Sequence, residues 1–201
     1  FIHTAGGGFY DADNQVIVDS AESVAGLQWL IDGFSKGYIP KASLEWKEED
    51  GRNAFEAGDL LFYRQWPYQY ANNKKSLGTE KFDVAALPSI DGKPFVSTLG
   101  GHNCAITKGS KNKATALKFV KWWISEDSER YQLETQTLAP IYGSLYDDPE
   151  LLKDFPYLPI LKKSLENAKS RPQAVYYGDV TANIQDSIYP AIQQPGSRAA
   201  K

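Results

Sequence analysis

The centre of the chain reads Gly58-Asp59-Leu60-Leu61-Phe62-Tyr63-Arg64-Gln65-Trp66-Pro67-Tyr68. The apolar run at residues 60–63 predicts a short buried strand, because it is brief and is bounded by polar and glycine residues. Pro67 follows where a short helix would begin, and the first turn of a helix tolerates the missing N–H of proline. The sequence therefore predicts a strand that leads directly into a helix, with aromatic residues at the carboxyl end of the strand.

The sequence on either side alternates between strand and helix patterns. Further strands are predicted at residues 16–18, 82–88 and 102–107. Helices are predicted from 19 or 20 to about 36, at 46–57 and 112–125, and at about 127–136, 157–168 and 179–193. Asp19 and Glu22 suit a capping box at the start of the first helix, and Gly37 suits its end. This alternation predicts the α/β class.

Three helices have apolar residues at helical spacing, which predicts their buried faces. These residues are Val24, Leu27, Ile31 and Phe34 in the first helix, Ala116, Leu117, Val120, Trp123 and Ile124 in helix 112–125, and Val180, Ile184 and Ile188 in the last helix. In the helix at 46–57, Ala54 and Phe55 are predicted to face inward and Gly58 to end the helix.

Composition excludes several classes of protein. The chain has 201 residues, of which 42% are hydrophobic and 23% charged, and this excludes a disordered chain. A net charge of -3 provides no basic field for nucleic acid. The one cysteine, Cys104, excludes an internal disulfide and a thiolate metal cluster, and no apolar run is long enough to span a membrane. The start at Phe1 and the absence of Met indicate a chain cut from a longer protein.

The residues that could carry catalysis are few and scattered. The two histidines, His3 and His102, lie far apart in the sequence, and no cofactor or metal motif is present. Glu48, Glu49 and Asp50 are consecutive, and neighbouring helix positions point about 100° apart, so two of them cannot face one bond. We interpret Glu49 and Asp50 as a solvated helix N-terminus, and Cys104 as a buried strand residue.

Two clusters combine aromatic residues with proline and polar donors, at 65–70 and 171–177. Aromatic residues make up 13% of the chain. A sugar ring has apolar C–H faces and a rim of hydroxyls, so its binding sites pair flat aromatic rings with carboxylates, amides and Arg. Ligands of open α/β sheets bind at the carboxyl ends of strands, where the first cluster is expected. The two clusters therefore favour carbohydrate binding.

The order of several motifs resembles one known family. These motifs are Gly6-Gly7-Gly8-Phe9-Tyr10-Asp11, Val18-Asp19-Ser20, the helix at 46–57 with Gly58 to Tyr68, Val84 to Pro88, Ser97 to His102, Lys111-Asn112-Lys113, Trp122 to Ser125, Leu145 to Pro149 and Arg171-Pro172. Together they resemble the extracellular solute-binding proteins of carbohydrate ABC transporters, of the maltose/trehalose type. The resemblance covers nearly the whole chain and corresponds to roughly the C-terminal half of such a protein.

The resemblance implies a fold of the periplasmic-binding-protein type II, with two α/β lobes that close on the ligand by a hinge motion. It assigns residues 1–95 to the first part of the C-terminal lobe. It assigns residues 96–137 to a hinge crossover and a segment of the N-terminal lobe. Residues 138–201 are assigned to the helical second part of the C-terminal lobe. It also implies a binding protein, without catalysis and without a cofactor.

The resemblance further implies a set of sugar-binding residues. Trp66 and Tyr68 are expected to stack on the sugar, Glu48 to accept from its hydroxyls, and Arg171 to donate to them. Gly100 and Gly101 would bring backbone close to the sugar, and Tyr177 is a further aromatic candidate. Many relatives have Trp where this chain has His102, so His102 is expected to hydrogen-bond a hydroxyl instead of stacking.

The function implied is that of the subunit that captures a di- or oligosaccharide for an ABC importer and delivers it to a membrane permease. The protein would lie outside the cytoplasmic membrane, in the periplasm or as a lipoprotein at the cell surface, and would meet the membrane only through an anchor or the permease. Two alternatives remain: a carbohydrate-active enzyme module that uses Glu48 or Glu49 as an acid, and a sensor or adhesion protein with the same fold.

One expectation concerns the segment at 100–137. If it belongs to the N-terminal lobe, the apolar face of helix 112–125 is left open to water. Exposed apolar patches of that size usually mark a partner surface. We therefore expect another copy of the chain to cover this face, or the segment to fold back differently from the family.

Overall fold

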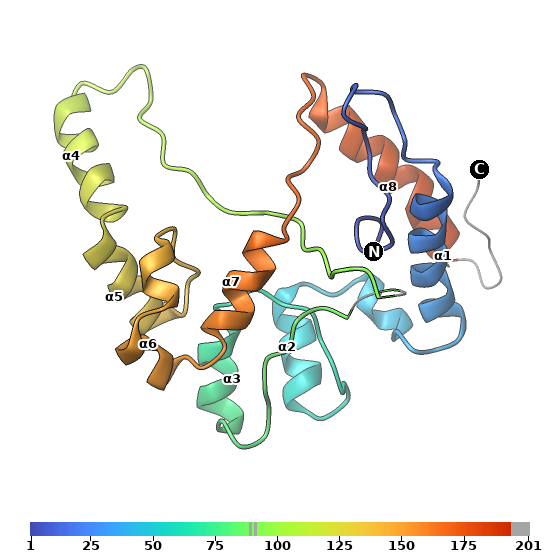
Figure 1. The fold of residues 1–201 in the computed structure, drawn as a ribbon, viewed down its shortest axis with the longest axis horizontal. Coiled ribbons are helices and arrows are strands. Elements are labelled where there is room, and N and C mark those ends of the chain that lie inside the picture. The colour runs from blue at the N-terminus through green and yellow to red at the C-terminus, as the bar shows by residue number, and fades with distance from the viewer. Residues whose placement is uncertain (89, 91, 194–201) are drawn as a thin grey trace. The chain divides into compact units, whose positions relative to one another are not determined.

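The computed structural model describes residues 1–88, 90 and 92–193 (Figure 1). The chain forms two compact units. Unit 1 contains residues 1–47, 87–99 and the chain from 164 onward, and unit 2 contains residues 48–86 and 100–163. Each unit is therefore assembled from segments that lie far apart in the sequence.

Helices account for the regular structure of both units. Unit 1 contains α1 (Ala21–Ser35), the 3-10 helix η1 (Lys41–Leu44) and α8 (Tyr177–Gln193). Unit 2 contains α2 (Glu48–Glu56), α3 (Gln69–Leu77), α4 (Lys113–Trp123), α5 (Glu126–Gln136), the 3-10 helix η2 (Gly143–Tyr146) and α6 (Pro149–Asp154). Helix α7 (Leu158–Glu166) contains the point where the chain passes from unit 2 to unit 1. The predicted long helices are confirmed, whereas η1, η2 and α6 were not predicted.

The prediction of strands at 16–18, 60–63, 82–88 and 102–107 is wrong, because the described residues in these ranges form no regular strand. Across the part of the chain that the structure describes, pairing between strands is limited to two isolated bridges, Tyr10 with Val16 and Thr98 with Lys169. A strand exists only where a neighbour completes its hydrogen bonds, and in these four segments the pairing is limited to the single bridge at Val16. Leu61 and Phe62, predicted to be buried, are 87% and 89% exposed.

Helix α1 begins one residue later than the predicted capping box. Ser20 is the N-cap, and its hydroxyl accepts a hydrogen bond from the backbone N–H of Ser23, so Asp19 does not cap the helix. Gly37 follows the C-cap with a φ of +76°, as predicted for the end of the helix. Of the predicted apolar face of α1, Ile31 and Phe34 are buried, and Val24 and Leu27 are half-buried.

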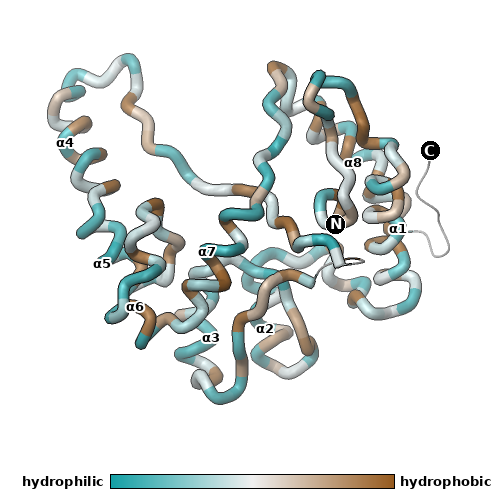
Figure 2. The backbone as a smooth tube through the Cα atoms, in the orientation of Figure 1, coloured by the Kyte–Doolittle hydropathy of each residue, from teal (hydrophilic) through white to brown (hydrophobic). Residues whose placement is uncertain are grey.

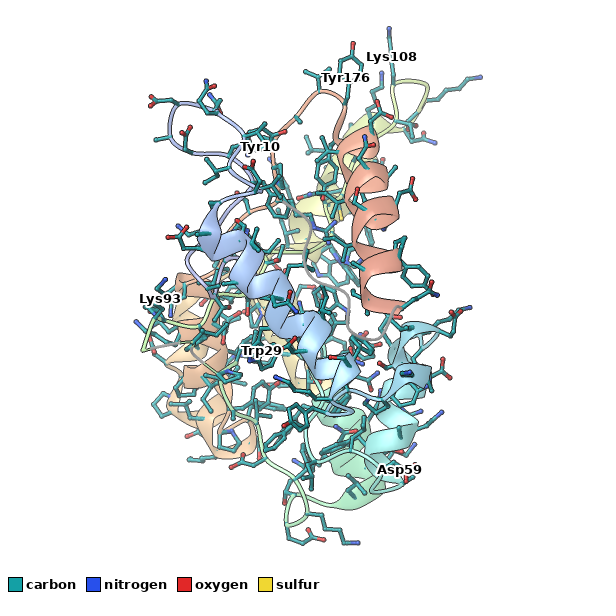
Figure 3. The ribbon with its side chains drawn as sticks, turned by 90° about the vertical axis from the view of Figure 1, so that its right-hand side faces the viewer. Tyr10, Trp29, Asp59, Lys93, Lys108 and Tyr176 are labelled. Atoms are coloured by element: carbon teal, nitrogen blue, oxygen red, sulfur yellow. The ribbon has the colours of Figure 1, made fainter. Side chains whose placement is uncertain are left out.

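Helices α1 and α8 pack together in unit 1 (Figure 1). The predicted apolar positions of α8 are half-buried, while Trp29 on the outer side of α1 is exposed (Figure 3). The ring of Trp29 packs against Phe1, with centroids 5.1 Å apart. Near the C-terminal end of α8, the Tyr189 hydroxyl donates to the Glu45 carboxylate over 2.8 Å.

The main core of the chain lies in unit 2, between α5, η2, α6 and the start of α7. Its buried members are Leu133, Leu145, Tyr146, Leu151, Phe155, Tyr157 and Leu158. The carboxylate of Asp148 caps α6 by accepting from the N–H groups of Glu150 and Leu151, and Pro149 occupies the first turn. Local capping therefore fixes a helix of six residues that carries Leu151 into the core.

The two buried tyrosines of this core predict a loss of stability in alkali. Burial raises the pKa of Tyr146 and of Tyr157 above the ordinary value of about 10. Above that pH the unfolded state releases these protons while the folded state retains them. The free energy of unfolding therefore falls as pH rises, by up to about 1.4 kcal/mol per pH unit for each tyrosine.

Urea denaturation at pH 9 and pH 11 measures this loss. Tyr157→Phe is expected to remove its share of the alkaline loss, and Tyr176→Phe, at an exposed position, is expected to leave the loss unchanged. An equal alkaline loss in wild type and Tyr157→Phe would contradict the assignment.

Helix α4 exposes much of its apolar surface, as expected for the segment at 100–137. Leu117, Trp123 and Ile124 are exposed, and Ala116 and Val120 are half-buried. The hydropathy colours alternate along this helix (Figure 2). Phe119 and Trp122 are also exposed, and their ring centroids lie 5.8 Å apart.

Cys104 is exposed and lies outside any strand, so its interpretation as a buried strand residue is wrong. The segment that carries it finds no partner strand among the described residues. Within the described part of the chain, no helix has the length and apolar character needed to cross a membrane.

Candidate functional site

The segment between α2 and α3 is held against both helices by aromatic and amide contacts. The rings of Phe55 and Tyr63 stack with centroids 4.5 Å apart. The buried Asn73 side chain donates to the Tyr63 hydroxyl over 2.5 Å. Because Phe55 lies on α2 and Asn73 on α3, Tyr63 joins the two helices just before the predicted aromatic cluster.

Residues 65–68, which we call the aromatic turn, follow this anchor. The Gln65 amide donates to the backbone carbonyl of Glu48 over 3.0 Å, and its oxygen accepts from the N–H of Trp66 over 3.0 Å. The Trp66 carbonyl accepts from the N–H of Gln69, the first residue of α3. The aromatic turn is thus tied to the first turn of α2 on one side and to α3 on the other, while Trp66 stays 46% exposed.

Gly100 lies against the edge of the Trp66 ring. A Cβ placed on Gly100 would lie 3.2 Å from Cη2 of the indole, so any side chain there would press on the ring. A Cβ on Gly101 would meet no atom within 4 Å, and His102 is exposed. The structure therefore brings Trp66 and Gly100 together, and the backbone carbonyl of Glu48 contacts the aromatic turn through the Gln65 amide. The ring of Trp66, with backbone at its edge, forms a surface that a ligand could reach.

Tyr68 is held by Glu49, the second residue of α2. The Tyr68 hydroxyl donates to the Glu49 carboxylate over 3.4 Å, and Arg52 donates to the same carboxylate over 2.7 Å. Glu49 is exposed, as expected for a helix N-terminus, and it is also anchored by these contacts. The hydrogen bond from Arg52 lowers the pKa of Glu49. A general acid needs a raised pKa, so this environment suits an acceptor and not a proton donor.

Arg171 and Tyr177, the remaining predicted binding residues, belong to unit 1. Arg171 is exposed, and Tyr177 is half-buried as the first residue of α8. Their neighbours Val175 and Tyr176 are 94% and 74% exposed at the tip of the segment that leads into α8 (Figure 3). This second cluster is therefore open to solvent in its own unit.

Two surface hollows in unit 2 lie beside α3, and the rings of the aromatic turn, those of Trp66 and Tyr68, line neither of them. One, of about 550 Å³, is lined by residues including Tyr70, Phe82 and Pro156, and the other, of about 570 Å³, by residues including Tyr70, Lys74 and Thr137. Among the described residues, no group of three His, Cys, Asp or Glu side chains could hold a metal ion.

Sequence reasoning missed Glu49 and Thr137 as neighbours of the aromatic turn. The Thr137 hydroxyl donates to the Pro67 carbonyl over 3.1 Å, although the two residues lie 70 positions apart. Such contacts between distant segments leave no local spacing signal. A helix was predicted at about 127–136, where α5 lies, but nothing at Thr137 indicated a contact with residue 67.

Comparison with known proteins identifies the family. Residues 1–168 match the family described as bacterial extracellular solute-binding protein. A probable ABC transporter-binding protein of Deinococcus radiodurans is 31% identical over 92% of this chain and 45% of its own length. A maltotriose-binding protein of Pyrococcus abyssi is 26% identical over 96% of this chain and 43% of its own length. A probable amino-acid ABC transporter periplasmic-binding protein of Sinorhizobium fredii is 26% identical over 80% of this chain and 36% of its own.

A solved structure, maltose-bound T. maritima MalE3, superposes with a TM-score of 0.88 at 31% identity, covering 98% of this chain and 51% of that one. The chain thus spans about half the length, or less, of the proteins that it matches. The superposition confirms the predicted fold class for the part that the chain spans. These relatives are named as binding proteins and not as enzymes, which confirms the non-enzyme prediction. The chain belongs to the bacterial extracellular solute-binding protein family.

Proposed function

We propose that the protein captures a di- or oligosaccharide for an ABC importer. The observation that carries this proposal is the exposed Trp66 ring, which lies beside the Gly100 backbone and in the same turn as Tyr68, whose hydroxyl donates to the Glu49 carboxylate. A flat aromatic face with polar groups at its rim suits a sugar ring. The maltotriose and maltose named for two of the similar proteins support the same ligand class.

In this proposal Trp66 and Tyr68 stack on the sugar, and Glu48 and His102 hydrogen-bond its hydroxyls. Gly100 and Gly101 offer backbone groups at close range. For unit 1, Arg171 is proposed as a donor to sugar hydroxyls and Tyr177 as a further aromatic residue. The lobe assignment of residues 1–95, 96–137 and 138–201 remains a prediction.

A thermal-shift screen with maltose, maltotriose and an amino-acid mixture tests the ligand class. A sugar at a hundredfold excess over its Kd is expected to stabilise the protein by about 2.7 kcal/mol. The amino acids are the control, because one relative is named for amino-acid transport. Stabilisation by amino acids alone would overturn the sugar proposal.

Arg171→Ala is expected to weaken sugar binding about tenfold or more, because an ionised donor to a hydroxyl is lost. The free energy of unfolding should change by less than about 0.5 kcal/mol, since Arg171 is exposed. Calorimetry with maltotriose and a urea melt separate the two effects, and Lys41→Ala, exposed in the same unit, is the control. A marked fall in stability for Arg171→Ala without sugar would show a structural role instead.

We infer that the protein delivers the sugar to the permease subunits of the importer. We also infer that it works outside the cytoplasmic membrane, in the periplasm or held at the cell surface by a lipid anchor. The family and the transporter names of its relatives support this placement. Contact with the membrane would then come through the permease or the anchor.

We also propose that two copies of the chain pair through the segment at 100–137. The exposed side chains of Leu117, Trp123 and Ile124 support this pairing, because burying each large apolar side chain stabilises by roughly 1.5–3 kcal/mol.

For the wild type, pairing predicts a dimer by light scattering and slow thiol labelling of Cys104, which is exposed in the single chain. For Leu117→Glu, it predicts a monomer in which Cys104 is labelled fast. Lys118→Glu on the same helix is the control. A wild-type monomer with rapidly labelled Cys104 would contradict pairing.

A further inference from the structure

Glu49 holds both Tyr68 and the first residue of α3. One carboxylate oxygen accepts from the Gln69 amide over 2.9 Å and from the Tyr68 hydroxyl over 3.4 Å, and the other accepts from Arg52 over 2.7 Å. The Gln69 amide also donates to the Tyr68 hydroxyl over 3.2 Å. Each donor in this group therefore has an acceptor, and the carboxylate is its common partner.

The members of this network are themselves restrained. Gln69 is 1% exposed, and its oxygen accepts from the Asn72 amide over 2.8 Å. Arg52 also pairs with Glu56 over 2.9 Å. Glu49 is thus fixed from its own helix through Arg52, and its contacts to Tyr68 and Gln69 transmit that restraint to the aromatic turn.

Thr137 holds the opposite side of the same turn. Its hydroxyl donates to the Pro67 carbonyl over 3.1 Å and accepts from the N–H of Ala71 over 3.4 Å. The side chain is buried, and it comes from the C-cap of α5, a segment remote in sequence. The residues flanking Trp66 are therefore fastened to α2 through Glu49 and Gln65, and to α5 through Thr137.

The backbone of Thr137 is strained. Its φ is +52°, in the left-handed region that β-branched residues rarely adopt. Glycine would take this conformation without cost, yet the position holds a threonine whose hydroxyl binds the aromatic turn. Residues held in such conformations cluster at sites that clamp a ligand.

We propose that Glu49 and Thr137 are positioning residues, which hold the aromatic turn so that Trp66 and Tyr68 present a preformed surface to the ligand. This inference rests on the proposed sugar binding. A surface that is already ordered loses less conformational entropy when the ligand binds, so the positioning residues raise affinity without touching the ligand.

Three variants and a matched control test this proposal. Glu49→Gln keeps the shape of the side chain but removes its charge, and Thr137→Gly removes the hydroxyl while relieving the strained φ. Thr137→Ser keeps the hydroxyl and is the conservative rescue. Glu150→Gln is the control, because Glu150 forms a comparable ion pair with Lys153 over 2.7 Å, on α6 and outside the network.

The first readout is the 19F spectrum of protein labelled with 5-fluorotryptophan, without ligand. The chain has five Trp residues, and Trp66→Phe assigns the signal of Trp66. Glu49→Gln and Thr137→Gly are expected to broaden or shift that signal alone, whereas Thr137→Ser and Glu150→Gln leave it unchanged. An unchanged Trp66 signal in both Glu49→Gln and Thr137→Gly would overturn the inference.

The second readout is the Kd for maltotriose, with thermal unfolding measured in parallel. Glu49→Gln and Thr137→Gly are expected to raise the Kd about tenfold, as for a lost hydrogen bond to a charged or buried group. Thr137→Gly should raise the Kd with little change in melting temperature, because relief of the strained φ offsets the lost hydrogen bonds. If Thr137 had a purely structural role, the Kd and the melting temperature would change together. Equal Kd values for wild type and both variants would overturn the positioning inference and leave the proposed sugar binding intact. Absence of maltotriose binding by wild type would overturn the proposed function, while the 19F spectrum would still judge the positioning.

Discussion

Leu158→Ala is expected to lower the free energy of unfolding by about 2–5 kcal/mol. Leu158 is fully buried at the start of α7, where it packs in the cluster formed by α5, η2 and α6. Removing its side chain loses apolar burial and leaves a cavity that the neighbouring Leu133 and Leu145 cannot fill without moving. Most of the buried apolar side chains among the described residues belong to this cluster, so the loss should affect the whole of unit 2.

Urea denaturation followed by circular dichroism measures this effect. Leu165→Ala on the same helix is the control, because Leu165 is exposed and its loss should cost less than about 1 kcal/mol. Equal effects of the two substitutions would show that the cluster around Leu158 is not the core that stabilises the unit.

Trp66→Ala is expected to weaken sugar binding by roughly 1–3 kcal/mol, by analogy with bases stacked on aromatic side chains. About half of the Trp66 side chain is exposed, and one edge of its ring lies against Gly100. The ring is therefore held in place while part of it remains free for a ligand. The free energy of unfolding should fall as well, because about half of the side chain is buried, so the affinity is compared in protein shown to be folded.

Calorimetric titration with maltotriose, with circular dichroism as the check of folding, measures the loss of affinity. Trp29→Ala is the control, since Trp29 is exposed to a similar extent on α1 and lies outside the proposed site. Unchanged affinity in a folded Trp66→Ala protein would assign Trp66 to packing.

The helices were predictable because each carries its own signal. The spacing of Ile31 and Phe34, and Gly37 after the last turn, are local features that need no knowledge of distant segments. The exact cap was not predictable, because Asp19 and Ser20 are both good N-caps and the choice depends on contacts of the folded loop before α1. Ser23, buried and hydrogen-bonded to Gly8, provides such a contact.

The strands were not predictable to the same degree, because a strand depends on its partner. Residues 60–63 have the composition of a buried strand, yet Leu61 and Phe62 are almost fully exposed. Intrinsic preference describes how well a side chain suits a sheet, and it cannot supply the neighbouring strand. The fold class is still confirmed, because the chain superposes on about half of maltose-bound MalE3 with a TM-score of 0.88.

The aromatic residues that are proposed to face the ligand could be picked out from the sequence, but their supporting contacts could not. Trp66 and Tyr68 stand out because they adjoin proline and follow an apolar run. Glu49 was interpreted, with Asp50, as part of a solvated helix N-terminus, and nothing in its local sequence separates it from Asp50. Its contact with Gln69, 20 positions away, arises only when α2 and α3 pack together.

Isothermal titration of maltotriose into the protein tests the central proposal most directly. The proposed function predicts saturable binding to wild type, about tenfold weaker binding or more to Trp66→Ala, and no binding of an amino-acid mixture. The absence of heat with maltotriose, together with saturable binding of amino acids, would contradict it.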